Sequence, residues 1–491
     1  MILDDILINL KENGETYCYI VDDKKYSYLQ LYSYTCNLYK LFMQKNFSKK
    51  PIIIYGNKDI YMKASILACL FAGITYIPID AYTPKSRVLS IVEQTSPAFI
   101  VGDFKNELVP NIEVDTILQI MNSNKTNEID NIYLKKNDTA YIIFTSGSTG
   151  TPKGVEVTYS NLDSCVSWLQ KETNTKNKSV ILNQASFSFD LSVADFYLSL
   201  LKSNCHFILS NSDKKDFKQL FNKLKNSNAN LAVFTPSFAD FLLLDKNFNS
   251  NLLPYLKKII FCGEKLLNST VTKLFNNFKN LEIINCYGPT ECTFAVTSVH
   301  LHNEKEFEND IPIGYPKCDV EISIVDNNCN LVSNNEIGEI LISGKSVAKG
   351  YLGKASNSFL EFKGKPSYLT GDLGYYKNDI LFFCNRKDSQ IKYKGYRIEL
   401  NDIENNLYKL KYIEKAVVTP LFYSNGNIKK IICFVKLKDT YLKSIFNIKN
   451  DLLKYLPQYM IPVISLVSYF PLNKNGKCDT KKLLEDYCNG K

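Results

Sequence analysis

The chain has 491 residues, and because one hydrophobic core rarely serves more than roughly 250–300 residues, this length indicates at least two domains. Apolar residues make up 45% of the chain and charged residues 22%, which excludes a disordered, collagenous or coiled-coil protein. With 59 basic and 50 acidic residues, the formal net charge is +9, a mild excess that favours an acidic partner without identifying it.

Histidine and cysteine content limits the chemistry. Only three histidines are present, so neither a histidine base nor a His-rich metal site is expected. The 14 cysteines include no C-x-x-C pair, and a zinc site therefore has no support. No signal peptide is recognised, and the longest apolar stretch, residues 64–79, is too short and too interrupted to span a bilayer. We expect a cytoplasmic protein with reduced thiols and no membrane insertion.

Short apolar runs alternate with amphipathic segments over the N-terminal part of the chain. The apolar runs predict buried strands at residues 52–55, 98–101, 141–144, 231–234, 258–262 and 282–285. Helical spacing predicts helices at residues 61–71, 160–169 and 217–224. This alternation predicts an α/β fold, with layered αβ subdomains built on parallel sheets.

The pattern changes after Pro312. Glycine-punctuated strands predicted at residues 320–325, 338–343 and 380–384 indicate a β-rich subdomain. From Gln390 onward we predict strands at 416–420 and 430–436 and helices at 401–410 and 448–456, which together form a small α+β unit. The charged segment 385–389 is the expected boundary between the large and small domains.

Residues 141–155, YIIFTSGSTGTPKGV, lead from an apolar run into a loop rich in Thr, Ser and Gly. Glycines allow backbone angles closed to other residues, so such a loop can turn several N–H groups toward one anion. The hydroxyls of Thr145, Ser146, Ser148 and Thr149 and the amine of Lys153 add donors suited to nucleotide phosphates. The alternative is a flexible Gly/Ser linker, but linkers do not normally follow a buried strand and end in Lys-Gly. The loop does not match a Walker A motif.

This loop resembles the phosphate-loop signature of the adenylate-forming enzymes: acyl-CoA synthetases, luciferases and peptide-synthetase adenylation domains. Further family motifs follow in order: AGITYIPID at 72–80, FDLSVADFY at 189–197, NCYGPTE at 285–291, GEILISG at 338–344, YLTGDLG at 368–374, NRKDSQIKYKGYRIELNDIE at 385–404 and NGKCD at 475–479. The resemblance covers nearly the whole chain. Within the superfamily the sequence most resembles the D-alanine–D-alanyl carrier protein ligases, through stretches such as TPSF, FCGE and LPQYMIP.

The resemblance implies an AMP-forming ligase that uses ATP and Mg²⁺. It implies that Tyr287 stacks on adenine, Asp372 binds the ribose hydroxyls, and Glu291 is the metal ligand. Lys477 would be the catalytic lysine, which offsets the repulsion between the substrate carboxylate and the α-phosphate. The residues implied to bind ATP are Thr145, Ser146, Gly147, Ser148, Thr149, Gly150, Lys153, Asn285, Cys286, Tyr287, Gly288, Pro289, Thr290, Asp372, Phe383, Arg386 and Lys477.

Asp190 indicates the substrate class. The resemblance implies that its carboxylate pairs with a substrate ammonium, whereas a CoA ligase for a small carboxylic acid would leave this buried charge unpaired at considerable cost. The alternative role is a helix N-cap. The residues implied to bind substrate are Asp190, Leu191, Ala194, Ser237, Cys262, Phe294 and Lys477, with Ile260, Cys286 and Ala295 at further pocket positions.

These pocket residues are mostly small or apolar, so we predict a small uncharged amino acid, with D-alanine first. Ala194 stands where those ligases usually have Met, Cys286 replaces Thr, and Phe294 replaces Val, which reshapes the pocket at similar total volume. Glycine, L-alanine, serine and β-alanine therefore remain alternatives to D-alanine.

The resemblance also implies two domains, residues 1–387 and a small mobile domain at 388–491, with a hinge at Asp388 and with Gly395 lining a thiol tunnel. No carrier segment is recognised, so we expect a separate phosphopantetheinyl carrier protein, as in lipoteichoic acid biosynthesis. Residues 389–491 hold 18 Lys and Arg against 9 Asp and Glu, so the whole basic excess lies there. This predicts a docking face for an acidic carrier, the alternative being a solvated lysine-rich surface. A monomer that binds no nucleic acid is expected, because no nucleic-acid motif matches.

Overall fold

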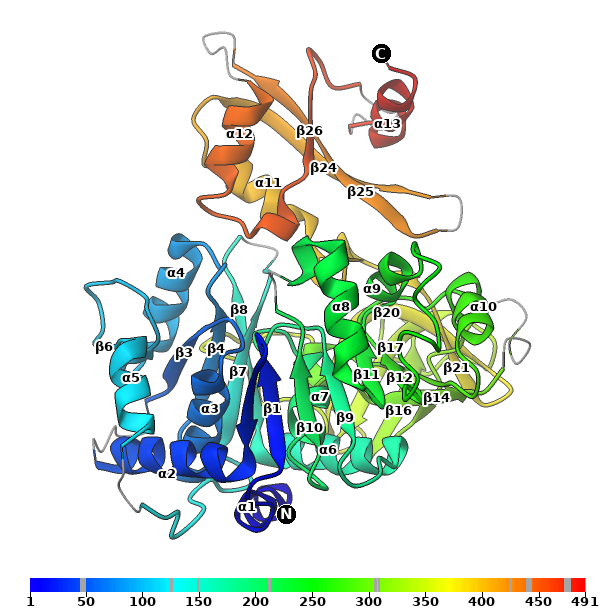
Figure 1. Ribbon diagram of the computed structural model, residues 1–491. Coiled ribbons are helices and arrows are strands. Elements are labelled where there is room, and N and C mark those ends of the chain that lie inside the picture. Colours follow the sequence, from blue (N-terminus) through cyan, green and yellow to red (C-terminus); the bar gives the residue numbers. More distant parts are fainter. Residues whose placement is uncertain are drawn as a thin grey trace. The chain divides into compact units, whose positions relative to one another are not determined.

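The computed structural model describes residues 1–44, 50–123, 127–147, 150–210, 213–303, 307, 310–423, 426–438, 444–471 and 478–490. These residues divide into two compact units. The first comprises Met1–Ala81, Gln94–Phe144 and Gly154–Lys387, and the second comprises Tyr82–Glu93, Thr145–Lys153 and Asp388–Lys491. Figure 1 labels elements of both units.

A seven-stranded sheet in the first unit has the order β18-β8-β7-β4-β3-β5-β6. Its strands are β3 (Ile52–Gly56), β4 (Tyr76–Asp80), β5 (Ile100–Val101), β6 (Asn111–Ile112), β7 (Thr139–Thr145), β8 (Lys153–Thr158) and β18 (Gly350–Tyr351). Strand β3 runs parallel to both β4 and β5. The accompanying helices are α2 (Tyr28–Gln44), α3 (Ile60–Ala72) and α5 (Val114–Met121), whereas most of α4 (Lys85–Thr95) belongs to the second unit. The strands expected at 52–55, 98–101 and 141–144 are confirmed in this sheet.

A nine-stranded sheet in the same unit has the order β15-β14-β13-β12-β11-β9-β10-β1-β2. Its strands are β1 (Tyr17–Val21), β2 (Lys24–Ser27), β9 (Val180–Asn183), β10 (Cys205–Ile208), β11 (Leu231–Phe234), β12 (Lys258–Phe261), β13 (Glu282–Tyr287), β14 (Thr297–Leu301) and β15 (Tyr315–Pro316). The six consecutive strands from β13 to β1 in this order are parallel to one another. The outer neighbours, β14 and β2, pair with them in the antiparallel direction. In such sheets ligands bind at the carboxyl ends of the strands.

The helices of this half are α1 (Ile2–Glu12), α6 (Tyr159–Thr173), α7 (Ser192–Leu198), α8 (Phe217–Ser227), α9 (Pro236–Leu242) and α10 (Asn268–Asn277), with 3₁₀ turns η1 (Asp213–Lys215) and η2 (Thr290–Cys292). Within the described residues, every helix is too short or too polar to cross a lipid bilayer. Helix α3 is nonetheless buried along all 13 of its residues, as is the short α7. A helix buried on every side is an interior element rather than a surface one.

The β-rich part of the first unit is an antiparallel five-stranded sheet. Its strands are β16 (Val320–Val325), β17 (Gly338–Gly344), β19 (Phe359–Phe362), β20 (Lys365–Lys377) and β21 (Ile380–Arg386). Strands β20 and β21 pair with Asp372 opposite Arg386. This register sets two of the predicted nucleotide-binding side chains next to each other.

The second unit contains the hairpin β22 (Gln390–Tyr393) and β23 (Tyr396–Glu399) and a three-stranded sheet of β24 (Ile413–Phe422), β25 (Ile428–Leu437) and β26 (Val463–Leu466). Its helices are α11 (Leu400–Tyr408), α12 (Ile445–Leu452) and α13 (Thr480–Cys488), with the 3₁₀ turn η3 (Gln458–Met460). Helix α12 begins and ends earlier than the predicted 448–456, because Ser444 forms a capping box with Asn447. The expected α/β class is confirmed, with a β-rich part and a smaller α+β part.

Candidate active site

Asp372 on β20 is the centre of a hydrogen-bonded group of side chains. Its Oδ2 accepts a hydrogen bond from the Tyr287 hydroxyl at 2.7 Å, and its Oδ1 accepts one from Arg386 Nη1. Arg386 Nη2 also donates to the carbonyl oxygen of Thr370 at 3.2 Å, and the Thr370 hydroxyl accepts from the Asp372 backbone N at 3.1 Å. A carboxylate has about four lone-pair positions, so this one is held in place and keeps acceptor capacity for further hydroxyl groups.

Tyr287 stays a hydrogen-bond donor in this group. Burial, strengthened by the neighbouring charge of Asp372, raises the pKa of the Tyr287 hydroxyl well above its ordinary value. The phenol is therefore neutral at physiological pH and donates its proton to the Asp372 carboxylate. Tyr287 is only 4% exposed and lies in an apolar cluster that Phe383 of β21 contacts at its edge.

Asp190 contacts Thr290 of the GPTE turn, which lies 100 residues later in the sequence. Its Oδ2 accepts a hydrogen bond from the Thr290 hydroxyl at 2.6 Å, and both side chains are buried. Helix α7 begins at Ser192 with Leu191 at its N-cap position, so the N-cap role considered for Asp190 does not apply to α7. The structure thus brings the predicted ammonium ligand next to a predicted phosphate ligand.

Most of the predicted substrate side chains belong to the main hydrophobic core of the first unit. Cys262 directly follows β12 and Cys286 lies near the end of β13, both at the carboxyl ends of parallel strands. The cluster members among the predicted residues are Leu191, Ala194, Ile260, Cys262, Cys286, Phe294 and Ala295. Ser237 lies at the start of α9, where its backbone N donates to Glu264 Oε2 at 2.9 Å.

Glu291 is the predicted metal ligand and is fully buried. Its Oε1 accepts a hydrogen bond from the Tyr351 hydroxyl at 2.6 Å. Among the described residues no group of three or more His, Cys, Asp and Glu side chains could hold a metal ion. Mg²⁺ is usually bound by one or two carboxylates together with substrate phosphates and water, so a single glutamate fits the ion that ATP carries.

The turn after β13 requires glycine. A Cβ on Gly288 would lie 2.6 Å from the Ala295 Cα and 2.8 Å from the Phe294 carbonyl oxygen. Thr293 and Phe294 themselves have φ angles of 58° and 72°, in the region that non-glycine residues rarely adopt. Such backbone is typical of functional sites, where surrounding contacts hold it. Here it brings the backbone of Phe294 and Ala295 close to Gly288.

Replacing Gly288 by alanine is expected to lower the free energy of unfolding by about 1–3 kcal/mol, because backbone atoms must shift to admit the methyl group. The same shift displaces Tyr287 and Thr290, so ATP-dependent activity should fall by about ten-fold or more. Urea unfolding and pyrophosphate exchange measure the two effects. As a control, Gly14→Ala adds a methyl group where nothing lies within 4 Å and should leave exchange unchanged. Equal exchange in both variants would contradict the assignment of this turn.

The Thr/Ser/Gly loop belongs to the second unit, apart from the Asp372 group. The Ser146 hydroxyl donates to the Arg397 carbonyl oxygen at 2.9 Å and accepts from the Glu399 backbone N at 3.2 Å. A Cβ on Gly147 would lie 2.1 Å from the Thr151 carbonyl oxygen, so this turn too requires glycine. Ser148 and Thr149 lie outside the described residues. The loop ends at Pro152, two residues earlier than expected, because Lys153 and Gly154 already belong to β8.

The remaining predicted residues take varied places. Asn285 Nδ2 donates to the Pro312 carbonyl oxygen at 2.8 Å, and Pro289 precedes η2. The Asp388 carboxylate accepts from the Gln390 backbone N at 3.1 Å. Gly395 lies in the turn between β22 and β23 with a φ of 81°. Lys477 lies outside the described residues.

Two supporting side chains were not predicted. The Thr370 hydroxyl accepts a hydrogen bond from the Asp372 backbone N, and the Thr370 carbonyl oxygen accepts one from Arg386. The Tyr351 hydroxyl donates to the Glu291 carboxylate. Thr370 lies within YLTGDLG, whereas Tyr351 lies seven residues after the end of GEILISG. The motif spacing marks these segments, but only the fold reveals which side chain supports which.

The chain is similar to several known proteins. The family model for AMP-binding enzymes matches residues 8–352. A protein named D-alanine--D-alanyl carrier protein ligase from Bacillus licheniformis is 36% identical over 485 residues, covering 96% of each chain. One of the same name from Lactococcus lactis is 36% identical over 482 residues, covering 94% of each chain. The Vibrio cholerae adenylation domain AlmE, solved with glycyl-adenosine-5′-phosphate, superimposes with a TM-score of 0.84 at 21% identity, covering 99% of this chain and 98% of that one.

The chain belongs to the family of AMP-binding enzymes. The expected resemblance to adenylate-forming enzymes is therefore confirmed, and so is the expected class, an AMP-forming ligase.

Proposed function

We propose that this ligase activates D-alanine as D-alanyl-AMP and transfers the D-alanyl group to the phosphopantetheine thiol of a separate carrier protein. The observation that carries the proposal is similarity over almost the whole chain to enzymes named for this reaction. The buried Asp190 carboxylate, directly before the buried pocket residue Leu191, supports an amino-acid substrate. An ammonium group there gains a charge-assisted hydrogen bond, which a simple carboxylic acid does not offer.

In the first half-reaction a carboxylate oxygen of the amino acid attacks the α-phosphorus of ATP. The bond between that phosphorus and the oxygen bridging to the β-phosphate breaks, and pyrophosphate leaves. Asp190 would hold the ammonium, while Asp372 and Arg386 would hold the ribose. Thr290 connects the proposed ammonium site with the proposed metal site, because its hydroxyl donates to Asp190 and the next residue in the chain is Glu291. Mg²⁺ bound by Glu291 and the phosphates would neutralise charge on the leaving group.

In the second half-reaction the thiolate of the carrier attacks the carbonyl carbon of the adenylate. A thioester forms and AMP leaves with the bonding electron pair. We propose that residues 1–387 and 388–491 are the two domains, that they rotate at Asp388 between the half-reactions, and that Gly395 borders the thiol path. Because the reaction consumes ATP, we propose that it takes place in the cytoplasm.

ATP–pyrophosphate exchange across an acid panel tests the substrate. D-alanine is expected to drive exchange more strongly than L-alanine, glycine, serine and β-alanine, because relatives that match over almost the whole chain are named for D-alanine. If another small amino acid supports exchange instead of D-alanine, the proposed reaction stands and that amino acid becomes the proposed substrate. Exchange with propionate but no amino acid would favour a CoA ligase, and absence of exchange with every acid would contradict the proposal.

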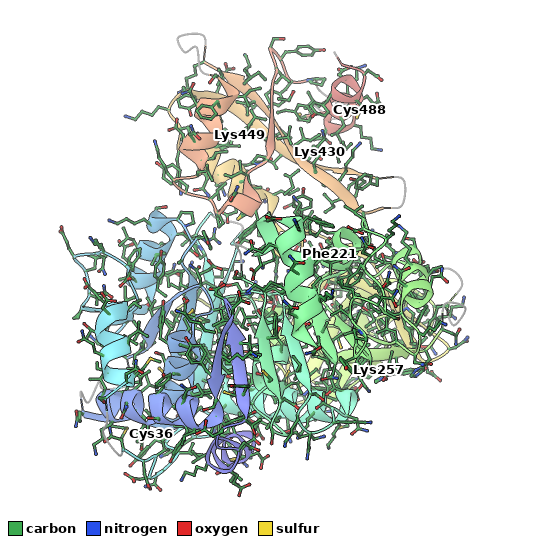
Figure 2. All side chains as sticks on the ribbon, in the orientation of Figure 1. Cys36, Phe221, Lys257, Lys430, Lys449 and Cys488 are labelled. Atoms are coloured by element: carbon green, nitrogen blue, oxygen red, sulfur yellow. The ribbon has the colours of Figure 1, made fainter. Side chains whose placement is uncertain are left out.

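We further propose that the C-terminal residues form a basic docking face for an acidic carrier. The exposed lysines include Lys394, Lys409, Lys411, Lys429, Lys438, Lys454, Lys481 and Lys482. Figure 2 labels Lys430 and Lys449 among the side chains of this unit. Some of these charges are paired locally, as Lys454 is with Asp451 at 2.7 Å. Surface pairs of this kind contribute little, so the excess of positive charge remains available to steer a partner.

Raising the salt concentration should therefore raise the Michaelis constant for carrier in thiolation and leave pyrophosphate exchange nearly unchanged, because exposed charges are screened beyond a Debye length of about 10 Å at 0.1 M salt. Replacing both Lys411 and Lys438 by glutamate should have the same effect at low salt. The matched control reverses two exposed lysines of the first unit, Lys135 and Lys246. Equal salt sensitivity in both half-reactions would contradict a docking face here.

A further inference from the structure

Lys63 is a charged side chain inside a fully buried helix. It lies on α3, whose 13 residues are all buried, and Lys63 itself is 0% exposed. Its Nζ donates to the Ser199 hydroxyl at 2.9 Å and lies 3.2 Å from Nδ1 of His206. The Nζ also lies 4.9 Å from the ring centroid of Tyr19. A buried ammonium is costly, so a site that keeps one in this way has a use for its position.

His206 also contacts Asp195, so its ring links Lys63 to Asp195. Nε2 of His206 lies 3.2 Å from Asp195 Oδ1, and both side chains are 0% exposed. An ammonium can only donate, so Nδ1 of His206 accepts from Lys63 and Nε2 carries the hydrogen given to Asp195. Burial, with the nearby charges of Lys63 and Lys58, lowers the pKa of His206 well below its ordinary value, which agrees with a neutral ring.

A second buried lysine, Lys58, is linked to the Asp195 carboxylate through Asn183. Asn183 Nδ2 donates to Asp195 Oδ2 at 3.0 Å, while Asn183 Oδ1 accepts from Lys58 Nζ at 2.8 Å. Lys58 Nζ also donates to the Leu209 carbonyl oxygen at 2.5 Å. Both oxygens of Asp195 are therefore held, one through His206 and one through Asn183. Elements of both large sheets contribute: α3 lies beside β3 and β4, and Asn183 and His206 lie on β9 and β10.

Asp195 connects these buried residues to the substrate cluster. It lies on α7, a helix of seven residues, directly after the pocket residue Ala194 and one helical turn after Leu191. Asp190 precedes the same helix and contacts Thr290. Because α7 is so short, any rotation or shift at Asp195 is transmitted to Ala194 and Asp190. In Figure 1, α7 is labelled beside β9 and β10.

We propose that Lys63, His206 and Asp195 form a positioning relay that fixes the orientation of α7 and so sets the affinity for the amino acid. Lys63 and His206 are thus positioning residues for substrate recognition, although neither contacts the substrate. The inference rests on the proposed function, since it assigns α7 to the amino-acid side of the site. A purely structural network would affect stability and leave the relative affinities for amino acid and ATP unchanged.

The test compares two replacements of His206 in the full-length enzyme, with Michaelis constants taken from pyrophosphate exchange. His206→Leu breaks the relay and should raise the constant for D-alanine about ten-fold or more, as small misplacements near a site commonly do, with the constant for ATP within about two-fold. His206→Gln keeps one donor and one acceptor and should restore the D-alanine constant to within about three-fold of the native enzyme. Ser65→Ala is the matched control, because among the described residues its buried hydroxyl on α3 has no hydrogen-bond partner.

A double variant guards against loss of folding. Lys63→Met with Asp195→Asn removes both ionisable groups together, so it should retain the folded state better than either change alone, yet it leaves the relay broken and the D-alanine constant raised. Unchanged constants for both substrates in the folded variants would overturn the relay. So would parallel changes for ATP and D-alanine, or unfolding of every relay-breaking variant. If the native enzyme shows no exchange with any amino acid, the proposed function fails instead, which separates the two claims.

Discussion

Replacing Lys477 by alanine should lower pyrophosphate exchange by about 10³-fold and leave the fold intact, because one preorganised charge on a transition state is worth about 10²–10³ in rate and this one also counters carboxylate–phosphate repulsion. Lys477 follows Asn475 and Gly476 in the motif NGKCD, and a lysine with no catalytic role at such a position would be solvated and replaceable. The resemblance to adenylate-forming enzymes is the basis for its role. A loss of this size corresponds to about 4 kcal/mol of transition-state stabilisation.

The measurement has two parts. Exchange is followed with D-alanine and ATP at saturation, and thiolation of the carrier is followed from synthetic D-alanyl-AMP, which bypasses the first half-reaction. Only the first should fail in Lys477→Ala. The matched control is Lys474→Ala, three residues earlier in the same segment. Exchange within about ten-fold of the native rate in Lys477→Ala would show that another cation performs this role.

Buried strands were the most predictable part of the fold. The segment Leu231–Phe234 is a run of four apolar residues and forms β11 with the predicted bounds, because a central parallel strand is covered on both faces. The nine-stranded order was not predictable, since it joins β1 to β10 across almost 190 residues of sequence. Pairings at such separation depend on how the helices pack, and local periodicity does not record that.

Charged side chains in the interior show why part of the site escaped prediction. In IYMKASILACLFA, Lys63 is the one charged residue, and by itself it suggests an exposed helix face. Its burial depends on Ser199 and His206, more than 130 residues away. The Thr/Ser/Gly loop is similar: its motif predicted the turn, but its hydrogen bonds to Arg397 and Glu399 depend on the folding of a distant segment.

Asp190→Asn should raise the Michaelis constant for D-alanine by about 100-fold or more, because truncating one partner of a buried charge pair costs about 2–5 kcal/mol. The amide keeps the size of the side chain and can still accept from Thr290, whose hydroxyl lies 2.6 Å from the carboxylate in the native protein. The constant for ATP should change by less than about three-fold, since Asp372 and Arg386 are untouched. This difference separates loss of substrate recognition from general damage to the site.

Propionate is D-alanine without the amino group. Comparing the two substrates on the same variant tests Asp190 independently of folding, because a loss of folded enzyme lowers both rates equally. If Asp190 binds the ammonium, the native enzyme should prefer D-alanine over propionate by about 100-fold or more in exchange, since a site built around a charged partner rejects the analogue that lacks it. Asp190→Asn should reduce that preference to within about ten-fold, because the amide offers neither substrate a charge. A preference that survives the substitution would move the ammonium site elsewhere and leave Asp190 as a structural partner of Thr290.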